Sequence, residues 1–319
     1  MAVTAPARTS LAVLPTPLVT ASRLADALGL TEPLLVKRDD LTGFAVAGNK
    51  ARQLELLVAE AEEQDADVVV TGGSTGSNFV AAAAAAASYA GMGCVVVLAG
   101  DAVNRTDHPN LAAATAWGAQ VRWTGNAERA SVDEMIPAVA AQLARDGARP
   151  YVIPRGGASA TGALGYRLAV DELVGQLAGR TPTIVIAVGA GGTLAGLVAG
   201  VVAHGNPLRI IGASVSRPVD EVAGRVLALA REVARRRGEK EPQPSDVELV
   251  DARGPGHGVA SPAGAAAAAL ALRYAGLVLD PVYTAKALAA LPAAVAGDPA
   301  LFWHTGGLLD AVAELMGPL

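Results

Sequence analysis

Short runs rich in β-branched residues alternate with alanine-rich stretches of helical length along most of this 319-residue sequence. The runs that predict strands are 34–38, 68–71, 94–98, 120–123, 151–153, 184–188 and 210–214. The stretches that predict helices are 50–64, 79–89, 111–117, 132–144, 160–177 and 194–203. Because parallel strands need long crossover connections, which are usually helices, this alternation predicts an α/β fold built on open parallel sheets.

The segment 49–157 contains its own alternation of strands and helices. We therefore expect it to form a small domain inserted into a larger domain of residues 1–48 and 158–319. Each domain is expected to have an open parallel sheet with helices on both faces.

Composition restricts the class of protein. Hydrophobic residues make up 52% of the chain and charged residues 17%, so a packed core is expected rather than disorder. The net charge of −5 gives no general attraction for nucleic acid or acidic membranes. Two long uncharged stretches, 79–100 and 181–203, are interrupted by glycines, so no membrane span is expected. We expect a cytoplasmic protein.

Cys94 is the only cysteine, so no disulfide can form within the chain. It lies in the strand-like run 94–98, which predicts a buried, unreactive thiol. No spacing of His, Cys or Asp fits a metal site.

The glycine-rich segment 189–193 is the clearest candidate site. It follows a buried strand and opens a helix, where backbone N–H groups and the helix dipole favour an anion. A dinucleotide site would need a third glycine at Leu194 and an acid after the strand 210–214, and neither is present. The loop therefore favours a phosphate monoester, with a tight turn that binds nothing as the alternative.

Lys50 follows Gly48 and Asn49 and opens a predicted helix. The positive potential of a helix N-terminus lowers the pKa of a lysine, and burial lowers it further. A lysine that forms a Schiff base needs such a shift. The alternative is an ordinary exposed lysine.

The segment 71–78 joins a strand to a helix and carries small hydroxyl side chains. Free N–H groups at the helix start suit a carboxylate. Ser77 or Asn78 acting only as a helix cap is the alternative.

Together these segments resemble the PLP (pyridoxal 5′-phosphate)-dependent D-cysteine desulfhydrase and ACC (1-aminocyclopropane-1-carboxylate) deaminase family, of the tryptophan-synthase-β-like, fold type II superfamily. The ordered matches cover nearly the whole chain: 15–18, 36–41, 48–52, 77–78, 153–158, 162–166, 189–193, 280–284 and 304–307.

The resemblance implies which residues would hold the cofactor and what each would do. Lys50 would hold PLP covalently and move the substrate's α-proton. The phosphate would be bound by Gly189, Ala190, Gly191, Gly192 and Thr193. Asn78 would bond the ring hydroxyl and Tyr283 would lie against the ring. Either Thr284 or Thr305 would face the pyridine nitrogen.

The resemblance also implies substrate contacts, and here the chain departs from the family. Ser77 would contact the substrate and, as in some relatives, act as nucleophile or base. The family's glutamine before the Ser-Asn pair is Gly76 here, and Phe79 follows the pair. His257 stands where a tyrosine helps to open the cyclopropane ring in ACC deaminases, so ring opening is not expected. His257 could instead act as an acid or base, or simply be a loop histidine.

These features predict a PLP-dependent lyase that removes the α-proton of a small amino acid and eliminates a β-substituent. D-cysteine is the nearest family substrate and would give pyruvate, sulfide and ammonia. The alternatives are a β-replacement synthase of the cysteine-synthase kind, a non-catalytic protein that binds PLP or an amino acid, and a phosphate-binding enzyme without PLP. The family implies a homodimer.

Overall fold

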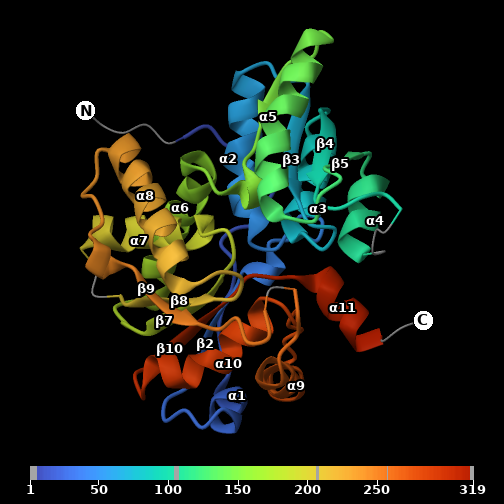
Figure 1. Cartoon of the computed structure of the whole chain (residues 1–319). Coiled ribbons are helices and arrows are strands. Elements are labelled where there is room, and N and C mark those ends of the chain that lie inside the picture. The colour runs from blue at the N-terminus through green and yellow to red at the C-terminus, as the bar shows by residue number, and fades with distance from the viewer. Residues whose placement is uncertain (1–5, 104–107, 206–207, 257, 317–319) are drawn as a thin grey trace.

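Two sheets flanked by helices make up the computed structural model, which describes residues 6–103, 108–205, 208–256 and 258–316 (Figure 1). The predicted α/β class is confirmed. The strands that lie within 49–157 form one sheet, and the remaining strands form the other. The domain boundaries themselves stay a prediction.

The larger sheet has six strands in the order β1-β2-β10-β7-β8-β9. Their bounds are β1 (Leu18–Thr20), β2 (Leu35–Arg38), β7 (Thr183–Val188), β8 (Ile210–Ser214), β9 (Glu248–Asp251) and β10 (Ala300–His304). All neighbours are parallel except β1, which runs antiparallel to β2 at the edge. The expected parallel sheet is therefore mixed at one edge, as is common in such folds.

Helices cover both faces of this sheet. The first face is covered by α6 (Ala160–Leu177), α7 (Gly192–His204) and α8 (Val219–Arg237), and the second by α1 (Ser22–Ala27), α9 (Pro262–Ala275) and α10 (Thr284–Val295). Successive residues of one strand point to opposite faces: Ile184 packs in the first core and Val185 in the second. A strand buried on both faces must be apolar throughout, which is why β7 reads as a continuous apolar run.

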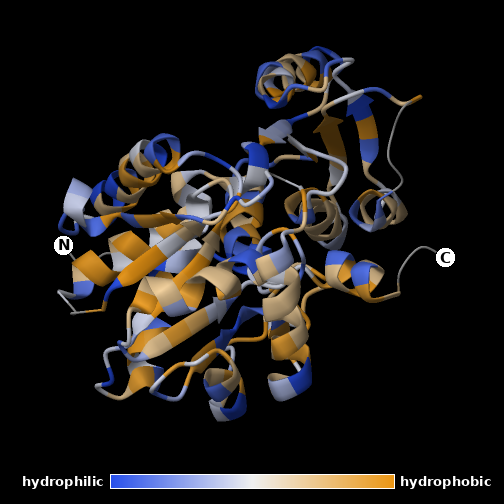
Figure 2. Cartoon of the chain, turned by 60° about the horizontal axis from the view of Figure 1, so that its bottom comes forward, coloured by the Kyte–Doolittle hydropathy of each residue, from blue (hydrophilic) through white to orange (hydrophobic). Residues whose placement is uncertain are grey.

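The smaller sheet has the order β5-β4-β3-β6, and all its pairs are parallel. Its strands are β3 (Val68–Gly73), β4 (Gly93–Leu98), β5 (Gln120–Trp123) and β6 (Pro150–Val152). One face packs against α2 (Lys50–Glu63), α3 (Asn78–Tyr89) and α4 (Pro109–Ala116), and the other against α5 (Arg129–Arg145). Figure 2 shows apolar strands inside and helices that mix apolar and polar residues outside.

The strands and helices expected from the sequence are confirmed, mostly with ends shifted by one to three residues. The sequence interpretation missed β1, β9 and β10, and also α1, α9, α10 and α11 (Leu308–Met316). It expected α8 only as a helix-like stretch around the basic residues 231–237 that ends at Gly238, where the structure places the C-cap. β1 and β9 are short strands at the sheet edges. β10, Ala-Leu-Phe-Trp-His, has no β-branched residue, so its pattern does not indicate a central strand. It pairs with β2 and β7, and the helices on the two sides of the sheet bury its two faces.

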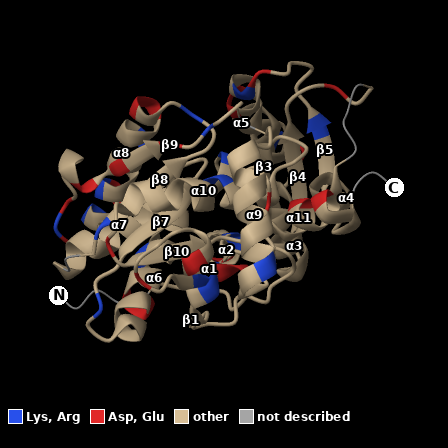
Figure 3. Ribbon diagram, turned by 90° about the horizontal axis from the view of Figure 1, so that it is seen from below, with Lys and Arg blue, Asp and Glu red and all other residues tan. Residues whose placement is uncertain are grey.

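Charges of both signs are mixed over the helices, as Figure 3 shows along α8. No helix within the described ranges is long and apolar enough to cross a membrane. Cys94 is buried as predicted, and burial raises the pKa of its thiol to about 12. Among the described residues, no group of three or more His, Cys, Asp or Glu side chains is placed to hold a metal ion.

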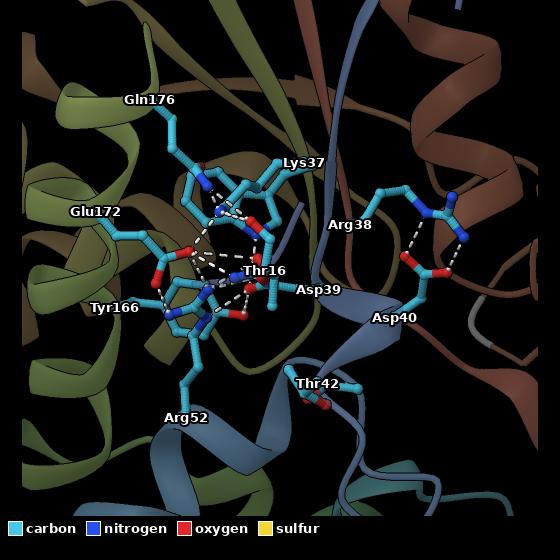
Figure 4. Close-up of polar contacts among 12 residues, drawn as sticks. Thr16, Lys37, Arg38, Asp39, Asp40, Thr42, Arg52, Tyr166, Glu172 and Gln176 are labelled. Atoms are coloured by element: carbon cyan, nitrogen blue, oxygen red, sulfur yellow. Dashed lines mark hydrogen bonds and ion pairs between the residues drawn. The ribbon is translucent and has the colours of Figure 1, made fainter. Parts of the chain in front are cut away.

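A buried ion pair joins α2, which packs on the smaller sheet, to the turn that follows β2 of the larger sheet. Asp39, in the 3₁₀ turn η1 (Asp39–Leu41) after β2, accepts from Arg52 of α2 at 2.9 Å on each oxygen (Figure 4). Its oxygens also accept from Thr16 at 2.7 Å, Tyr166 at 2.6 Å and Trp303 at 2.8 Å.

The balance of forces keeps Asp39 ionised. Burial alone would raise the pKa of this carboxyl, but the Arg52 charge and the hydrogen bonds from Arg52, Tyr166 and Trp303 bring it down to about 2. Arg52 also donates to Glu172 of α6 at 2.8 and 3.0 Å. One guanidinium therefore ties α2 to the large sheet and to α6.

Helices α6 and α7 approach so closely that a side chain would not fit between them. A Cβ on Gly196 would lie 2.0 Å from the carbonyl oxygen of Ala163 and 2.6 Å from Cβ of Tyr166. On α8, by contrast, a Cβ on Gly224 would meet nothing within 4 Å.

Asp39→Ala should lower the free energy of unfolding by about 3–5 kcal/mol, because it leaves the Arg52 charge buried without its main partner. The measurement is the urea midpoint of the apoprotein. As a control, Glu248→Ala removes the exposed pair with Arg209, which solvent already screens, and should leave the midpoint close to that of the wild type. Equal shifts in both variants would contradict this account.

The two helical glycines should respond oppositely to alanine. Gly196→Ala should destabilise the protein by about 1–3 kcal/mol, because α6 and α7 must move apart. Gly224→Ala should stabilise it by about 0.5–1 kcal/mol, because alanine favours the helix and finds open space. Thermal unfolding of both variants checks this, and a stabilised Gly196→Ala protein would show that the helices are not in close contact.

Candidate active site

A cavity of about 310 Å³ lies where the carboxyl ends of strands from both sheets meet. Its wall comes from the start of α2 and from the segments that follow β3, β7, β8 and β10. In open parallel sheets, ligands bind at this end of the strands. The three loops that the sequence singled out lie on this one cavity.

Lys50 is the first residue of α2 and lines the cavity. The backbone before it lies against the segment that follows β10: the Asn49 N–H donates to the Thr305 carbonyl at 2.9 Å. Gly48 has φ +52°, and a Cβ there would lie 2.5 Å from the same carbonyl oxygen. Only glycine fits at this position, and the close approach fixes where Lys50 enters the cavity. Burial lowers the pKa of Lys50 to about 8.

The glycine loop forms a cradle in the cavity wall at the start of α7. Gly191 has φ +96°, and Gly192 is the first helical residue. A Cβ on Gly189 would lie 3.0 Å from the ring of Tyr283, and one on Gly192 would lie 3.2 Å from the amide nitrogen of Gln53. Thr193 accepts from the Asn49 side chain at 3.1 Å. Bare backbone therefore faces the cavity beside the helix N-terminus.

Gln53 was missed by the sequence interpretation. It lies one turn after Lys50 on α2, lines the cavity and is buried. Neither its amide nitrogen nor its amide oxygen has a hydrogen-bond partner among the described residues. Buried polar groups are nearly always paired, so this amide indicates a missing ligand next to the cradle. The signal in the sequence was its i+3 spacing from Lys50, which places both side chains on one helix face.

Ser77 and Asn78 line the cavity at the start of α3. The Ser77 hydroxyl caps the helix, accepting from the Val80 N–H at 3.3 Å. Asn78 donates to Asp310 of α11 at 3.4 Å, and Asn110 of α4 donates to the other oxygen at 2.7 Å. Burial and the charge of Asp280 raise the pKa of Asp310 to about 7.

Phe79 is buried in the cavity wall. Its ring lies under the positive-φ turn at Gly157, where a Cβ would come within 2.5 Å of the ring. Tyr283 also lines the cavity, and burial raises the pKa of its phenol to about 12, so the phenol is protonated at neutral pH.

The two threonines that the sequence left as alternatives lie in different surroundings. Thr305 lines the cavity. Thr284 does not, and its hydroxyl is engaged with Asp280, accepting from the Asp280 N–H at 2.8 Å and donating to Oδ2 at 2.5 Å. His257 lies outside the described residues, so its predicted role stays a prediction.

Arginines in the cavity wall were also missed. The described lining includes Arg129, Arg155, Arg217 and Arg225, and the only acidic side chain in it is Asp280. The oxygens of Asp280 accept from the backbone N–H groups of Val282, Tyr283 and Thr284. Arg155 lies in the stretch 153–158 that resembles the family, but the four arginines come from distant parts of the chain and share no common spacing.

Comparison with known proteins agrees with this geometry. Residues 9–306 match the family model described as pyridoxal-phosphate dependent enzyme. The chain is 37% identical to the D-cysteine desulfhydrase of Salmonella typhi over 307 residues, which cover 92% of each protein. The structure of an ACC deaminase homologue superposes with a TM-score of 0.89 at 33% identity, covering 96% of this chain and 93% of that one.

A fungal L-serine ammonia-lyase from Rhizomucor miehei shares the fold, with a TM-score of 0.69 at 17% identity and coverage of 97% and 98%. The predicted fold type II architecture is confirmed. The family model spans most of the sequence and the D-cysteine desulfhydrase is similar along nearly its whole length, so this chain belongs to the family of pyridoxal-phosphate dependent enzymes.

Proposed function

We propose that this protein is a PLP-dependent lyase that removes the α-proton of a small amino acid and eliminates its β-substituent. One observation carries the proposal: the lysine with a lowered pKa and the glycine cradle line the same cavity. The similarity to D-cysteine desulfhydrase supports elimination and suggests D-cysteine as the first substrate to test.

The residues present fit the cofactor. A phosphate in the cradle would meet the N–H groups at the start of α7, the Thr193 hydroxyl and the unpaired amide of Gln53. Side chains at Gly189 or Gly192 would reduce this space. Lys50 lies in the same cavity wall and its amine is partly uncharged at neutral pH, as covalent attachment of PLP requires.

When bound, PLP acts as an electron sink for the carbanion left by loss of the α-proton. The protein's task is to move that proton and to hold the reacting groups. The Nζ atom of Lys50 can accept the proton, because a base with a pKa of about 8 is matched to working near neutrality.

The segment before α3 is suited to the substrate carboxylate. It combines the Ser77 hydroxyl, the Asn78 amide and the positive end of a helix that has no acidic residue in its first turn. We assign Asn78 to the cofactor's ring hydroxyl and Ser77 to the substrate, with Phe79 forming the apolar wall beside them. Tyr283 is assigned to the ring face, and its protonated phenol could donate a proton to a leaving group.

Between the two threonines we favour Thr305 as the partner of the pyridine nitrogen, because it lines the cavity while Thr284 is engaged with Asp280. A hydroxyl cannot keep the pyridine nitrogen protonated as a carboxylate would. The cofactor ring would then be a weaker electron sink, which suits elimination better than transamination. His257 as an acid or base, a homodimeric assembly and a cytoplasmic location also remain parts of this proposal.

Lys50→Ala should abolish the visible absorption band of lysine-bound PLP, because the variant has no amine at this position. The measurement is the absorbance spectrum of the purified protein after PLP is added. Lys286→Met is the matched control: this lysine is also buried, but it donates to the carbonyls of Arg253 and Gly256 and does not line the cavity. Retention of the band in Lys50→Ala, or its loss in the control, would contradict the assignment of Lys50.

The wild-type holoenzyme should release a keto acid and ammonia from D-cysteine or another amino acid with a β-leaving group. A panel of D- and L-amino acids assayed for keto acid checks this, and Lys50→Ala should lose at least about 10³-fold in rate. A product that forms only when a nucleophile is added would indicate a β-replacement synthase instead. Binding without exchange of the α-hydrogen with solvent would indicate a protein that binds PLP but does not catalyse.

A further inference from the structure

Three of the four arginines that line the cavity lie close enough for the charges of two of them to act on the third. Arg129 is the first residue of α5, Arg155 opens the 3₁₀ turn η2 (Arg155–Gly157) after β6, and Arg217 follows β8. All three line the cavity and are partly buried. We call them the arginine cluster. Burial lowers the pKa of Arg129, and repulsion from Arg217 and Arg155 lowers it further.

Two members of the arginine cluster have acidic partners, one on α5 and one on α8. Arg155 pairs with Asp133 at 2.6 and 3.1 Å, and Arg217 pairs with Glu221. Arg129 has no hydrogen bond or ion pair with any side chain that the structure describes, although electrostatic interactions with Tyr283 and Glu221 partly offset the lowering of its pKa.

The position of Arg129 is itself unfavourable. It lies at the N-terminus of α5, where the helix dipole disfavours a cation, and no acidic residue occupies the first turn. Repulsion, burial and the dipole therefore all oppose the charged form in the free protein. Arrangements that raise the energy of a charged side chain in a cleft are typical of functional sites, because a ligand of opposite charge relieves the cost.

The two anions that the proposed function requires have donors of their own. The cofactor phosphate is served by the backbone and neutral side chains of the glycine cradle on α7. The substrate's α-carboxylate is served by the Ser77 segment on α3. Arg129 belongs to neither group, since it opens α5 on the other face of the small sheet from α3.

We propose that the arginine cluster binds a second anionic group on the substrate, so that the preferred substrates are amino acids whose side chain carries a carboxylate or another oxyanion. Guanidinium groups bind such oxyanions through paired, charge-assisted hydrogen bonds. The proposal rests on the amino-acid substrate of the proposed function, but not on the elimination step.

Aspartate and asparagine test this, because they have the same shape and differ in charge. Both enantiomers of each are titrated into the holoenzyme, and binding is read from the change in the visible spectrum of the bound cofactor. One enantiomer of aspartate should bind at least about 10-fold more tightly than the matching asparagine. Equal affinities would overturn the proposal.

Arg129→Gln should reduce this preference to less than about 3-fold while PLP affinity, measured by reconstitution of the apoprotein, stays unchanged. Arg122→Gln is the matched control, because Arg122 is an exposed arginine of β5 that does not line the cavity and should keep the preference. Weakened PLP binding in Arg129→Gln together with an unchanged preference would assign the cluster to the cofactor phosphate and overturn the proposal.

A calorimetric titration separates this inference from the proposed function. Succinate and butyrate have no amino group, so their binding does not depend on reaction with PLP. Succinate binding more tightly than butyrate, with the difference lost in Arg129→Gln, would support the arginine cluster even if no amino acid were eliminated. No difference between them, in a protein that also does not distinguish aspartate from asparagine, would overturn it.

Discussion

The buried pair of Asp39 and Arg52 determines where Lys50 lies. Arg52 is on α2, two residues after Lys50, and its guanidinium is bound at once by Asp39 of the large sheet and Glu172 of α6. Because a buried charge without its partner is so costly, α2 has little freedom to rotate or slide. The first turn of that helix, and Lys50 with it, is therefore held against the carboxyl end of the large sheet.

Close backbone contacts complete this positioning. Gly48 lies against the Thr305 carbonyl, and a Cβ on Gly189 or Gly192 of the cradle would crowd Tyr283 or Gln53. These contacts bring the segments that precede α2 and α7 and the segment that follows β10 to one place. A site built this way is preorganised, so binding energy is not spent on arranging it.

The cavity combines three kinds of anion-binding chemistry. The cradle offers backbone N–H groups and a helix dipole. The Ser77 segment offers a hydroxyl, an amide and a second helix N-terminus. The arginine cluster offers side chains that carry a full positive charge. The first two suit the cofactor and the α-carboxylate common to all amino acids. The charged cluster is the part of the cavity that would distinguish one amino-acid side chain from another.

The sequence by itself determined the α/β class, most strands and helices, and the three loops that line the cavity. These are local properties: alternation of strand and helix patterns, glycines at strand–helix junctions and a lysine at a helix start. Only the tertiary structure decided that the Gln53 amide has no hydrogen-bond partner among the described residues, and that Thr305 rather than Thr284 lines the cavity. It also decided that Arg129, Arg155 and Arg217 line the same cavity. Those facts depend on which segments lie side by side, and residues brought together from distant parts of the chain share no spacing that a single sequence could reveal.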